Sequence, residues 1–261
     1  MSELLDLDAA NADLYESFTR VHERFGATSR ALAALVGDLG DAEVVDLGCG
    51  TGVLTRELLT SHAESGRSPR AILGLDCSPA MLDHARRNVD DPRVRFVCGR
   101  AELLDRIIEG PVDAVLCNAA IWAMDVEEVA SAVARVLRPG GRFAFNHVHA
   151  EPPSTDLHSI MRSLAHEQSI PLANARPLAP RRELLSALAE RRMTLVRAIE
   201  TTVDESVASQ WDFLRLPGST FRSLPGVPYP ERLRLLEQAW ARAGERREQP
   251  VRWIHVLMEK S

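Results

Sequence analysis

A chain of 261 residues with 45% hydrophobic side chains is long enough to bury a substantial core as one large α/β domain. The formal net charge of −6 and the scatter of basic residues among acidic ones argue against a nucleic-acid partner. Of the 31 basic residues only Lys260 is a lysine, so a phosphate-binding or Schiff-base lysine has no position in the body of the chain. An acidic start and the lack of a run of about 18 apolar residues predict a cytoplasmic protein without a membrane span.

The predicted elements alternate in type along the first 150 residues. Apolar residues at helical spacing predict two helices between residues 11 and 40, with Gly26 between the two runs. We predict strands at 44–47, 71–75, 94–97, 112–116 and 142–148, and helices near 53–62, 79–89 and 126–137. This alternation is typical of a parallel sheet covered by helices on both faces.

Two irregular segments interrupt the second part of the chain. The first contains a polar helix near 155–168 and several prolines, and the second contains aromatic residues and a helix that starts near Pro230. Between the two segments we predict a helix at 181–191 and a strand at 194–203, and a last strand starts at Pro250. The α/β rhythm therefore resumes after the first insertion.

A glycine-rich turn follows the first predicted strand, in the stretch Asp46-Leu-Gly48-Cys-Gly50-Thr-Gly52. Glycines lack a Cβ, so they permit tight backbone conformations and allow a ligand to contact the main chain. Dinucleotide sites use the spacing G-x-G-x-x-G, whereas G-x-G-x-G led by an acidic residue suits a ligand that carries an amino acid and a sulfonium cation. The alternative is a plain strand-to-helix turn.

The second predicted strand ends in Asp76, about 25 residues beyond the turn. A carboxylate at this position can accept both hydroxyls of a ribose. The other interpretation is that it caps the helix that begins around Ser78-Pro79, and the two roles are compatible. The cysteines also stand at the ends of predicted strands but form no C-x-x-C pair, so we expect small residues in a crowded crevice and no metal site: Cys49, Cys77, Cys98 and Cys117.

Together these stretches resemble the class I (Rossmann-like) S-adenosylmethionine-dependent methyltransferases, in the branch that modifies small molecules. The similarity lies in residues 44–52, 74–82, 99–103, 112–116 and 136–143, which follow the family order. The resemblance implies an α/β fold with a doubly wound seven-stranded sheet of order 3-2-1-4-5-7-6, whose last strand is antiparallel, and S-adenosylmethionine as the cofactor. It implies one structural domain, with N-terminal helices in 1–40 over the cofactor site, a core in 41–150 and the end of the sheet in 151–261. Lid insertions near 151–180 and 205–249 would emerge at the carboxyl edge.

The resemblance also implies individual cofactor contacts. The turn would lie along the methionine part, Asp46 would hold its amino group and Asp76 would take the ribose hydroxyls. Arg100 departs from the family, which often has an acidic acceptor for the adenine amino group there, so this contact must move to Glu102 or a main-chain carbonyl, or be lost. The predicted cofactor residues, with Cys77 and Met81 beside the adenine and Asn118 near the sulfonium, are Tyr15, Asp46, Gly48, Gly50, Asp76, Cys77, Met81, Ala101, Glu102 and Asn118.

Methyl transfer from a sulfonium is an in-line displacement, in which positioning and exclusion of water supply much of the acceleration. The strongest candidate for a general base is His147, at the carboxyl end of the fifth strand; alternatively it only hydrogen-bonds the lid. Aromatic residues of the lid predict a largely apolar acceptor pocket, although part of them could simply pack the lid onto the sheet. The predicted pocket residues are His22, Trp122, His149, Trp211 and Phe213.

The sequence therefore predicts methyl transfer to an oxygen, nitrogen or carbon atom of a small, partly apolar metabolite, in secondary metabolism. The glycine spacing argues against a nicotinamide oxidoreductase. Two alternatives stay open, because cofactor motifs report binding and not turnover. One is a relative that binds S-adenosylmethionine but catalyses a cyclisation or another non-methylating step, and the other is a silent binding subunit. The oligomeric state is also left open.

Overall fold

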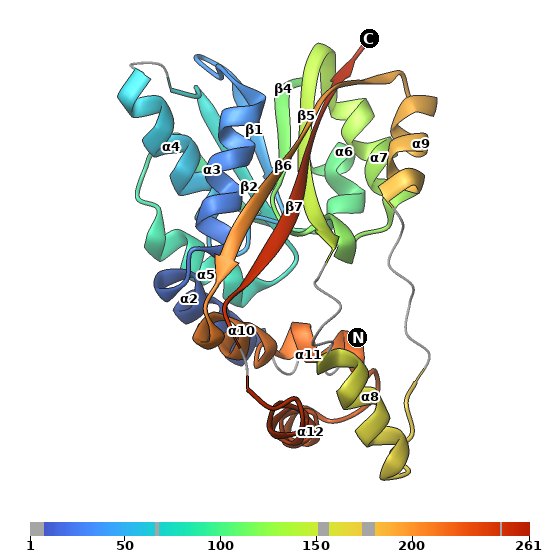
Figure 1. Cartoon of the computed structure of the whole chain (residues 1–261). Helices are drawn as coiled ribbons and strands as arrows, with labels where there is room; N and C mark the ends of the chain where they lie inside the picture. The colour runs from blue at the N-terminus through green and yellow to red at the C-terminus, as the bar shows by residue number, and fades with distance from the viewer. Residues whose placement is uncertain (1–7, 66–67, 151–156, 174–180, 246) are drawn as a thin grey trace.

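The computed structural model of the chain describes residues 8–65, 68–150, 157–173, 181–245 and 247–261. Its centre is a seven-stranded sheet of order β3-β2-β1-β4-β5-β7-β6 (Figure 1). The strands are β1 (Glu43–Leu47), β2 (Ala71–Asp76), β3 (Val94–Cys98), β4 (Val112–Cys117), β5 (Leu137–Ala150), β6 (Met193–Glu205) and β7 (Gln249–Lys260). β1 to β5 pair in parallel, and β7 runs antiparallel to both β5 and β6. The predicted fold class is confirmed.

Helices cover both faces of the sheet, as Figure 1 shows. One face carries α3 (Arg24–Val36), α4 (Val53–Ser65) and α5 (Pro79–Asn88), and the other carries α6 (Leu104–Ile107), α7 (Val126–Val136) and α9 (Arg181–Glu190). Adjacent strand residues face opposite layers: Val44 packs with Leu32 and Leu58 on the α3 side, whereas Val45 packs with Val133 on the α7 side. Burial on both faces explains why the central strands read as continuous apolar runs.

Capping residues start two of the helices that follow strands. Ser78 is the N-cap of α5, since its hydroxyl accepts a hydrogen bond from Met81 N at 3.0 Å, and Pro79 occupies the first turn. Asp125 caps α7 in the same way through Glu128 N at 3.2 Å. The N-termini of α5 and α7 therefore lie at the carboxyl edge of the sheet, where open α/β sheets bind ligands.

Most predicted boundaries differ from the observed ones by one to three residues, and two differences are more informative. The break between α2 (Asp8–Val21) and α3 lies at His22, and Gly26 belongs to the first turn of α3; its predicted place between the helices is wrong. The reason is that the helical ladder restarts at Glu23, whose carbonyl accepts from Ala27 N at 2.8 Å, and a first turn tolerates glycine. β5 begins earlier than predicted, at Leu137, since Leu137 already pairs with Val112 of β4, and the register shifts before Arg142 pairs with Ala114.

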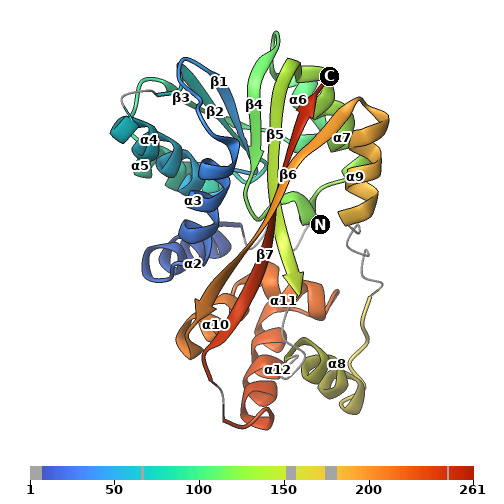
Figure 2. The ribbon, with the colours of Figure 1, turned by 45° about the horizontal axis from the view of Figure 1, so that its top comes forward.

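Four helices form a layer beyond the carboxyl ends of the strands: α8 (Leu157–Glu167), α10 (Val207–Leu214), α11 (Pro217–Ser223) and α12 (Tyr229–Arg242) (Figures 1 and 2). They share a small core of their own that includes Met161, Leu224 and Leu235. These four helices, which form the lid, lie within the segments predicted as insertions, of which 151–156 and 174–180 are outside the described residues. No helix in the described part of the chain is long and apolar enough to cross a membrane.

Candidate cofactor and active site

The glycine turn after β1 has the left-handed backbone that its sequence requires. Gly48, Gly50 and Gly52 have φ values of +72°, +52° and +84°, which side chains with a Cβ rarely adopt. A Cβ on Gly48 would lie 2.7 Å from the Cβ of Ala120, so the loop after β4 lies directly against the turn. Glycine at this position is therefore required by both its conformation and its neighbour.

Asp46 is buried in β1 just before the turn, with 1% of its surface exposed. Thr55 Oγ1 donates to Asp46 Oδ2 at 2.6 Å, whereas Oδ1 has no hydrogen-bond partner among the described residues. Burial, more than the nearby charge of Asp76, raises the pKa of the Asp46 carboxyl to about 7. A buried acceptor without a donor is costly, so this atom fits a ligand that brings a cationic amino group.

Asp76 connects the end of β2 to the turn and to α5. Its Oδ2 accepts from Gly50 N and its Oδ1 from Ser78 N, both at 2.9 Å. The N-cap of α5 is Ser78, so the alternative of Asp76 as the capping residue is wrong: its carboxylate bonds to the backbone ahead of the helix. Burial raises the pKa of Asp76, and each oxygen keeps a second lone pair for a hydroxyl.

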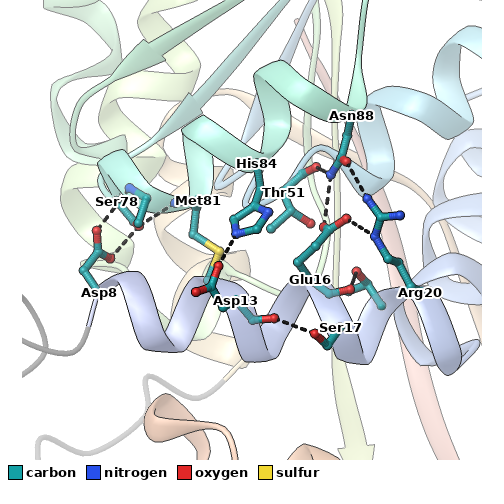
Figure 3. A network of polar contacts seen from close by, with 12 residues as sticks. Asp8, Asp13, Glu16, Ser17, Arg20, Thr51, Ser78, Met81, His84 and Asn88 are labelled. Carbon is teal, nitrogen blue, oxygen red and sulfur yellow. Dashed lines mark hydrogen bonds and ion pairs between the residues drawn. The ribbon is translucent and has the colours of Figure 1, made fainter.

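Helix α2 lies across α5 and the turn, as Figure 3 shows. Its position leaves the Tyr15 ring 3.6 Å from where a Cβ on Gly50 would lie, so an aromatic ring covers the main chain of the turn. Three acidic residues of α2 hold the helix on α5: Asp8 accepts from Ser78 Oγ at 2.5 Å, Asp13 pairs with His84 at 2.8 Å, and Glu16 accepts from Asn88 Nδ2 at 3.0 Å.

The residues predicted around the adenine gather near the ends of β2 and β3. Cys77 is exposed, whereas Met81 in α5 and Ala101 in η1 (Ala101–Leu103) are buried. Glu102 is already engaged: its Oε1 accepts from Asp125 N at 3.0 Å and its Oε2 from Arg100 Nε at 3.3 Å. Each of these oxygens keeps a second lone pair, so Glu102, a main-chain carbonyl and a lost contact stay open as alternatives for the adenine amino group.

The four cysteines end up along the same edge of the sheet. Cys49 and Cys117 are buried, and Cys77 and Cys98 are exposed. Burial raises the pKa of the Cys117 thiol, which disfavours the thiolate that binds metals. The described residues contain no group of three or more histidine, cysteine or carboxylate side chains that could hold a metal ion.

The side chain of Asn118 turns from the end of β4 toward α3. Its Nδ2 donates to Ser29 Oγ at 2.9 Å, and its Oδ1 accepts from Asn146 Nδ2 at 2.6 Å. Asn146 in turn lies 3.3 Å from the Nδ1 atom of His255 in β7. Sequence reasoning missed Asn146 and His255, although both interrupt otherwise apolar strand runs, which was the available signal.

The three histidines predicted at the active site have different surroundings in the structure. His147 Nδ1 donates to the carbonyl of Val148 at 2.9 Å, so Nε2 carries the lone pair of the neutral ring. His22, at the end of α2, pairs with Asp212 of α10 at 2.9 Å and so ties the N-terminal helices to the lid. The backbone of His149 belongs to β5, but its side chain is outside the described residues.

An aromatic cluster lies between the N-terminal helices, the lid and the ends of β6 and β7. Phe25 is 5.2 Å from Tyr15, 6.3 Å from Phe213 and 6.5 Å from Trp253, measured between ring centroids. The guanidinium of Arg24 lies 3.7 Å from the Phe213 ring centroid and makes a bidentate, buried ion pair with Glu205 at the end of β6.

The predicted pocket aromatics are not all brought together. Phe213 joins the cluster around Phe25, whereas Trp211 packs edge-on against Trp240, 4.9 Å away, in the core of the lid. Trp122 is 40% exposed, and its Nε1 donates to Ala119 O at 2.8 Å, which closes the loop after β4. Trp211 therefore packs inside the lid, and not between the lid and the sheet.

The fold and this site together define a class of protein. The strand order is that of the Rossmann-like methyltransferases, and the left-handed glycine turn, Asp46 and Asp76 lie together at the ends of β1 and β2. Residues 44–141 match the family described as "Methyltransferase domain". In these residues, which make up less than half of the chain, the protein is therefore similar to a methyltransferase domain.

Two curated relatives are similar over part of their length. A trans-aconitate 2-methyltransferase of Deinococcus radiodurans is 36% identical over 163 residues, which are 60% of this chain and 55% of that protein. A malonyl-[acyl-carrier protein] O-methyltransferase of Acetivibrio thermocellus is 28% identical over 137 residues, 52% of this chain and 46% of that protein. The chain thus spans about half the length of the curated relatives it matches.

A solved structure extends the likeness to most of the chain. It is a geranyl diphosphate C-methyltransferase from Streptomyces coelicolor A3(2), in complex with Mg²⁺, geranyl diphosphate and S-adenosyl-L-homocysteine. It is 20% identical, covers 90% of this chain and 79% of that one, and has a TM-score of 0.51. At this identity the likeness shows the fold alone.

Proposed function

We propose that the chain transfers a methyl group from S-adenosylmethionine to an oxygen, nitrogen or carbon atom of a small, partly apolar metabolite. The observation that carries the proposal is the buried, unpartnered Oδ1 of Asp46 beside the left-handed turn of Gly48 and Gly50. When bound, the cofactor supplies an electrophilic methyl group. The methyltransferase names of both curated relatives support this reaction.

Four residues would hold the cofactor through their polar atoms and the main chain. Asp46 Oδ1 would accept from the amino group, because it lacks a donor inside the described protein. Asp76 would accept from the ribose hydroxyls with its remaining lone pairs. Tyr15 and the main chain of Gly50 would enclose the methionine part and exclude water, which strengthens the electrostatic interactions there. Cys77, Met81 and Ala101 would border the adenine.

The aromatic cluster supports a partly apolar acceptor. Phe18, Phe25 and Trp253 supply apolar surface next to the loop after β4, and the buried Nε1 of Trp253 has no acceptor among the described residues. The charge of Arg24 is compensated by Glu205, so this cation is engaged before any acceptor arrives. An apolar lining with few polar groups is typical of small-molecule sites.

The proposal extends to a cytoplasmic protein of secondary metabolism that acts without nucleic acid.

For an acidic acceptor, we propose His147 as the general base. Its Nδ1–H is held by Val148 O, so Nε2 would accept the acceptor's proton.

The proposal is tested by label transfer. The full chain is incubated with methyl-labelled S-adenosylmethionine and fractions of small metabolites, and we expect label in an extractable small molecule. Asp76→Ala serves as the control: it weakens cofactor binding by about 1–3 kcal/mol, the range for hydrogen bonds lost from a buried site. The label should therefore decline with this variant at limiting cofactor. His147→Ala, run in parallel, should lower kcat while cofactor affinity stays unchanged.

Two outcomes would contradict the proposal. Measurable cofactor binding without transfer to any fraction would favour the cyclising or silent alternatives. Unchanged turnover of His147→Ala would remove the general base and leave positioning alone as the source of acceleration.

A further inference from the structure

A row of five polar side chains crosses the sheet beneath α3, at the level of the loop that follows β4. It runs from Ser29 in α3 through Asn118 at the end of β4, Asn146 in β5 and His255 in β7 to Thr201 in β6. Ser29, Asn146 and His255 have no exposed surface. Polar groups are costly to bury without partners, so a fully linked row of this kind specifies one arrangement.

The direction of each hydrogen bond is determined by its neighbours. Ala119 N donates to Asn146 Oδ1 at 2.7 Å, so the amide nitrogen of Asn146 faces Asn118 Oδ1 at 2.6 Å and His255 Nδ1 at 3.3 Å. His255 Nδ1 is therefore an acceptor, and its Nε2–H donates to Thr201 Oγ1 at 2.8 Å. Burial lowers the pKa of His255 to about 4, which keeps the ring neutral.

Asn146, in the middle of the row, contacts an unusual part of the loop. Ala119 has a φ of +54°, a left-handed conformation that disfavours residues with a Cβ, and its N–H is the group held by Asn146. The next residue, Ala120, borders the glycine turn, since a Cβ on Gly48 would lie 2.7 Å from it. The conformation of residues 118–122 therefore shapes one wall of the turn.

We propose that Asn146 and His255 are positioning residues for the methyl-donor site. They hold residues 118–122 in the conformation that borders the glycine turn, and they act through Asn118 and Ala119 without touching the cofactor. The inference rests on the proposed function, because it takes the turn as the S-adenosylmethionine site. The inference requires a hydrogen-bond acceptor at the position of His255 Nδ1 to keep residues 118–122 in this conformation.

Two substitutions of His255 isolate that acceptor. His255→Asn and His255→Leu remove the same ring and the same bond to Thr201, and the two new side chains have nearly the same shape. The asparagine keeps an oxygen near the position of Nδ1, and the leucine does not. We expect the leucine variant to bind S-adenosyl-L-homocysteine about tenfold more weakly in titration calorimetry, the factor for about 1.4 kcal/mol or one buried hydrogen bond. The asparagine variant should stay within about threefold of the wild type.

A stability control separates positioning from general destabilisation. Leu188 in α9 is completely buried in the layer on the opposite face of the sheet. Leu188→Ala leaves a cavity there and lowers stability without touching the row. Its affinity for S-adenosyl-L-homocysteine should equal that of the wild type when both are measured below their unfolding temperatures.

Equal affinities of the asparagine and leucine variants would overturn the inference, as would an equal loss in Leu188→Ala. If His255→Leu does not fold, Asn146→Ala replaces it in the test, because this substitution removes the partners of Ala119 N and Asn118 Oδ1 together. Wild-type affinity of Asn146→Ala would also overturn the inference. A wild-type chain that binds no S-adenosyl-L-homocysteine contradicts the proposed function itself, whereas binding with no difference between the variants contradicts this inference alone.

Discussion

The two halves of the proposed site, the cofactor half and the acceptor half, are built by different means. The cofactor half uses main-chain groups of one turn, at Gly48 and Gly50, and carboxylates at the ends of two adjacent strands, Asp46 and Asp76. The acceptor half uses side chains from distant parts of the chain: the N-terminal helices, the lid and β7 all contribute rings to the cluster around Phe25.

This difference explains where the chain resembles its relatives. A site made by the main chain depends on glycines and acidic residues at a short, constant spacing, which a family can share while its other residues change. A site made by side chains can be rebuilt with each new acceptor. Accordingly, the family match covers residues 44–141 and does not include the lid.

The largest expected effect is on the side-chain half. Glu205→Ala leaves the guanidinium of Arg24 buried without its partner, and we expect a loss of about 3–5 kcal/mol in the free energy of unfolding, measured with urea. S-adenosyl-L-homocysteine affinity should change little at temperatures where the variant is folded, because the turn is built independently.

Two controls sharpen this comparison. Glu200 faces Arg252 at 3.7 Å on the exposed edge strand, so Glu200→Ala should cost less than about 1 kcal/mol. The double variant Arg24→Met with Glu205→Leu should recover most of the lost stability, because apolar residues of similar volume replace buried ion pairs well. Equal costs for Glu205→Ala and Glu200→Ala would show that the buried pair does not hold the acceptor half together.

The two halves also differ in how far they follow from the sequence. The glycine turn was predicted from local spacing and the sheet order from the family resemblance, and the order is confirmed. The neighbours of Phe213 and Trp211 were not, because which aromatic ring meets which depends on the angle of α10 against α3 and α12, a tertiary property without local signal. The bonds of Asn146 and His255 were missed for the same reason: their partners lie on other strands.

The next expected effect concerns the main-chain half and uses a matched pair of glycines. Gly48 and Gly110 both have left-handed φ values, +72° and +93°. A Cβ on Gly110 would meet no described atom within 4 Å, whereas one on Gly48 would lie 2.7 Å from Ala120. Both Gly→Ala variants should lose about 1–2 kcal/mol of unfolding free energy to backbone strain, and Gly48→Ala should lose about 1–3 kcal/mol more to overpacking.

The same pair distinguishes stability from binding. Because only Gly48→Ala displaces residues 118–122, it should also weaken S-adenosyl-L-homocysteine binding in titration calorimetry, while Gly110→Ala should bind like the wild type. Equal affinities of the two variants would mean that the loop after β4 does not shape the turn, and that the main chain of the cofactor half is less sensitive to its neighbours than the contact suggests.

The smallest expected effect is the pH dependence of cofactor binding that arises from the Asp46 carboxyl. Burial raises the pKa of its carboxyl to about 7, so the ligand-free protein is protonated there below that pH. A cationic amino group prefers the carboxylate, so affinity should rise about tenfold per pH unit, about 1.4 kcal/mol, as pH approaches 7 from below, and then level off. Stability has the opposite sign: in the unfolded chain this carboxyl loses its proton near the ordinary aspartate pKa of 3.8, so the contribution of Asp46 to the unfolding free energy falls as pH rises from 3.8 to 7.

Calorimetry at pH 6 in two buffers of different ionisation enthalpy measures this proton directly. Binding of S-adenosyl-L-homocysteine should release close to one proton to the buffer, because the amino group must displace it from the carboxyl. Asp46→Asn has the same shape and cannot titrate, so it should abolish both the proton release and this part of the pH dependence. Proton release by the asparagine variant equal to that of the wild type would show that Asp46 does not receive the amino group, and that the acidic residue before the turn serves the fold rather than the cofactor.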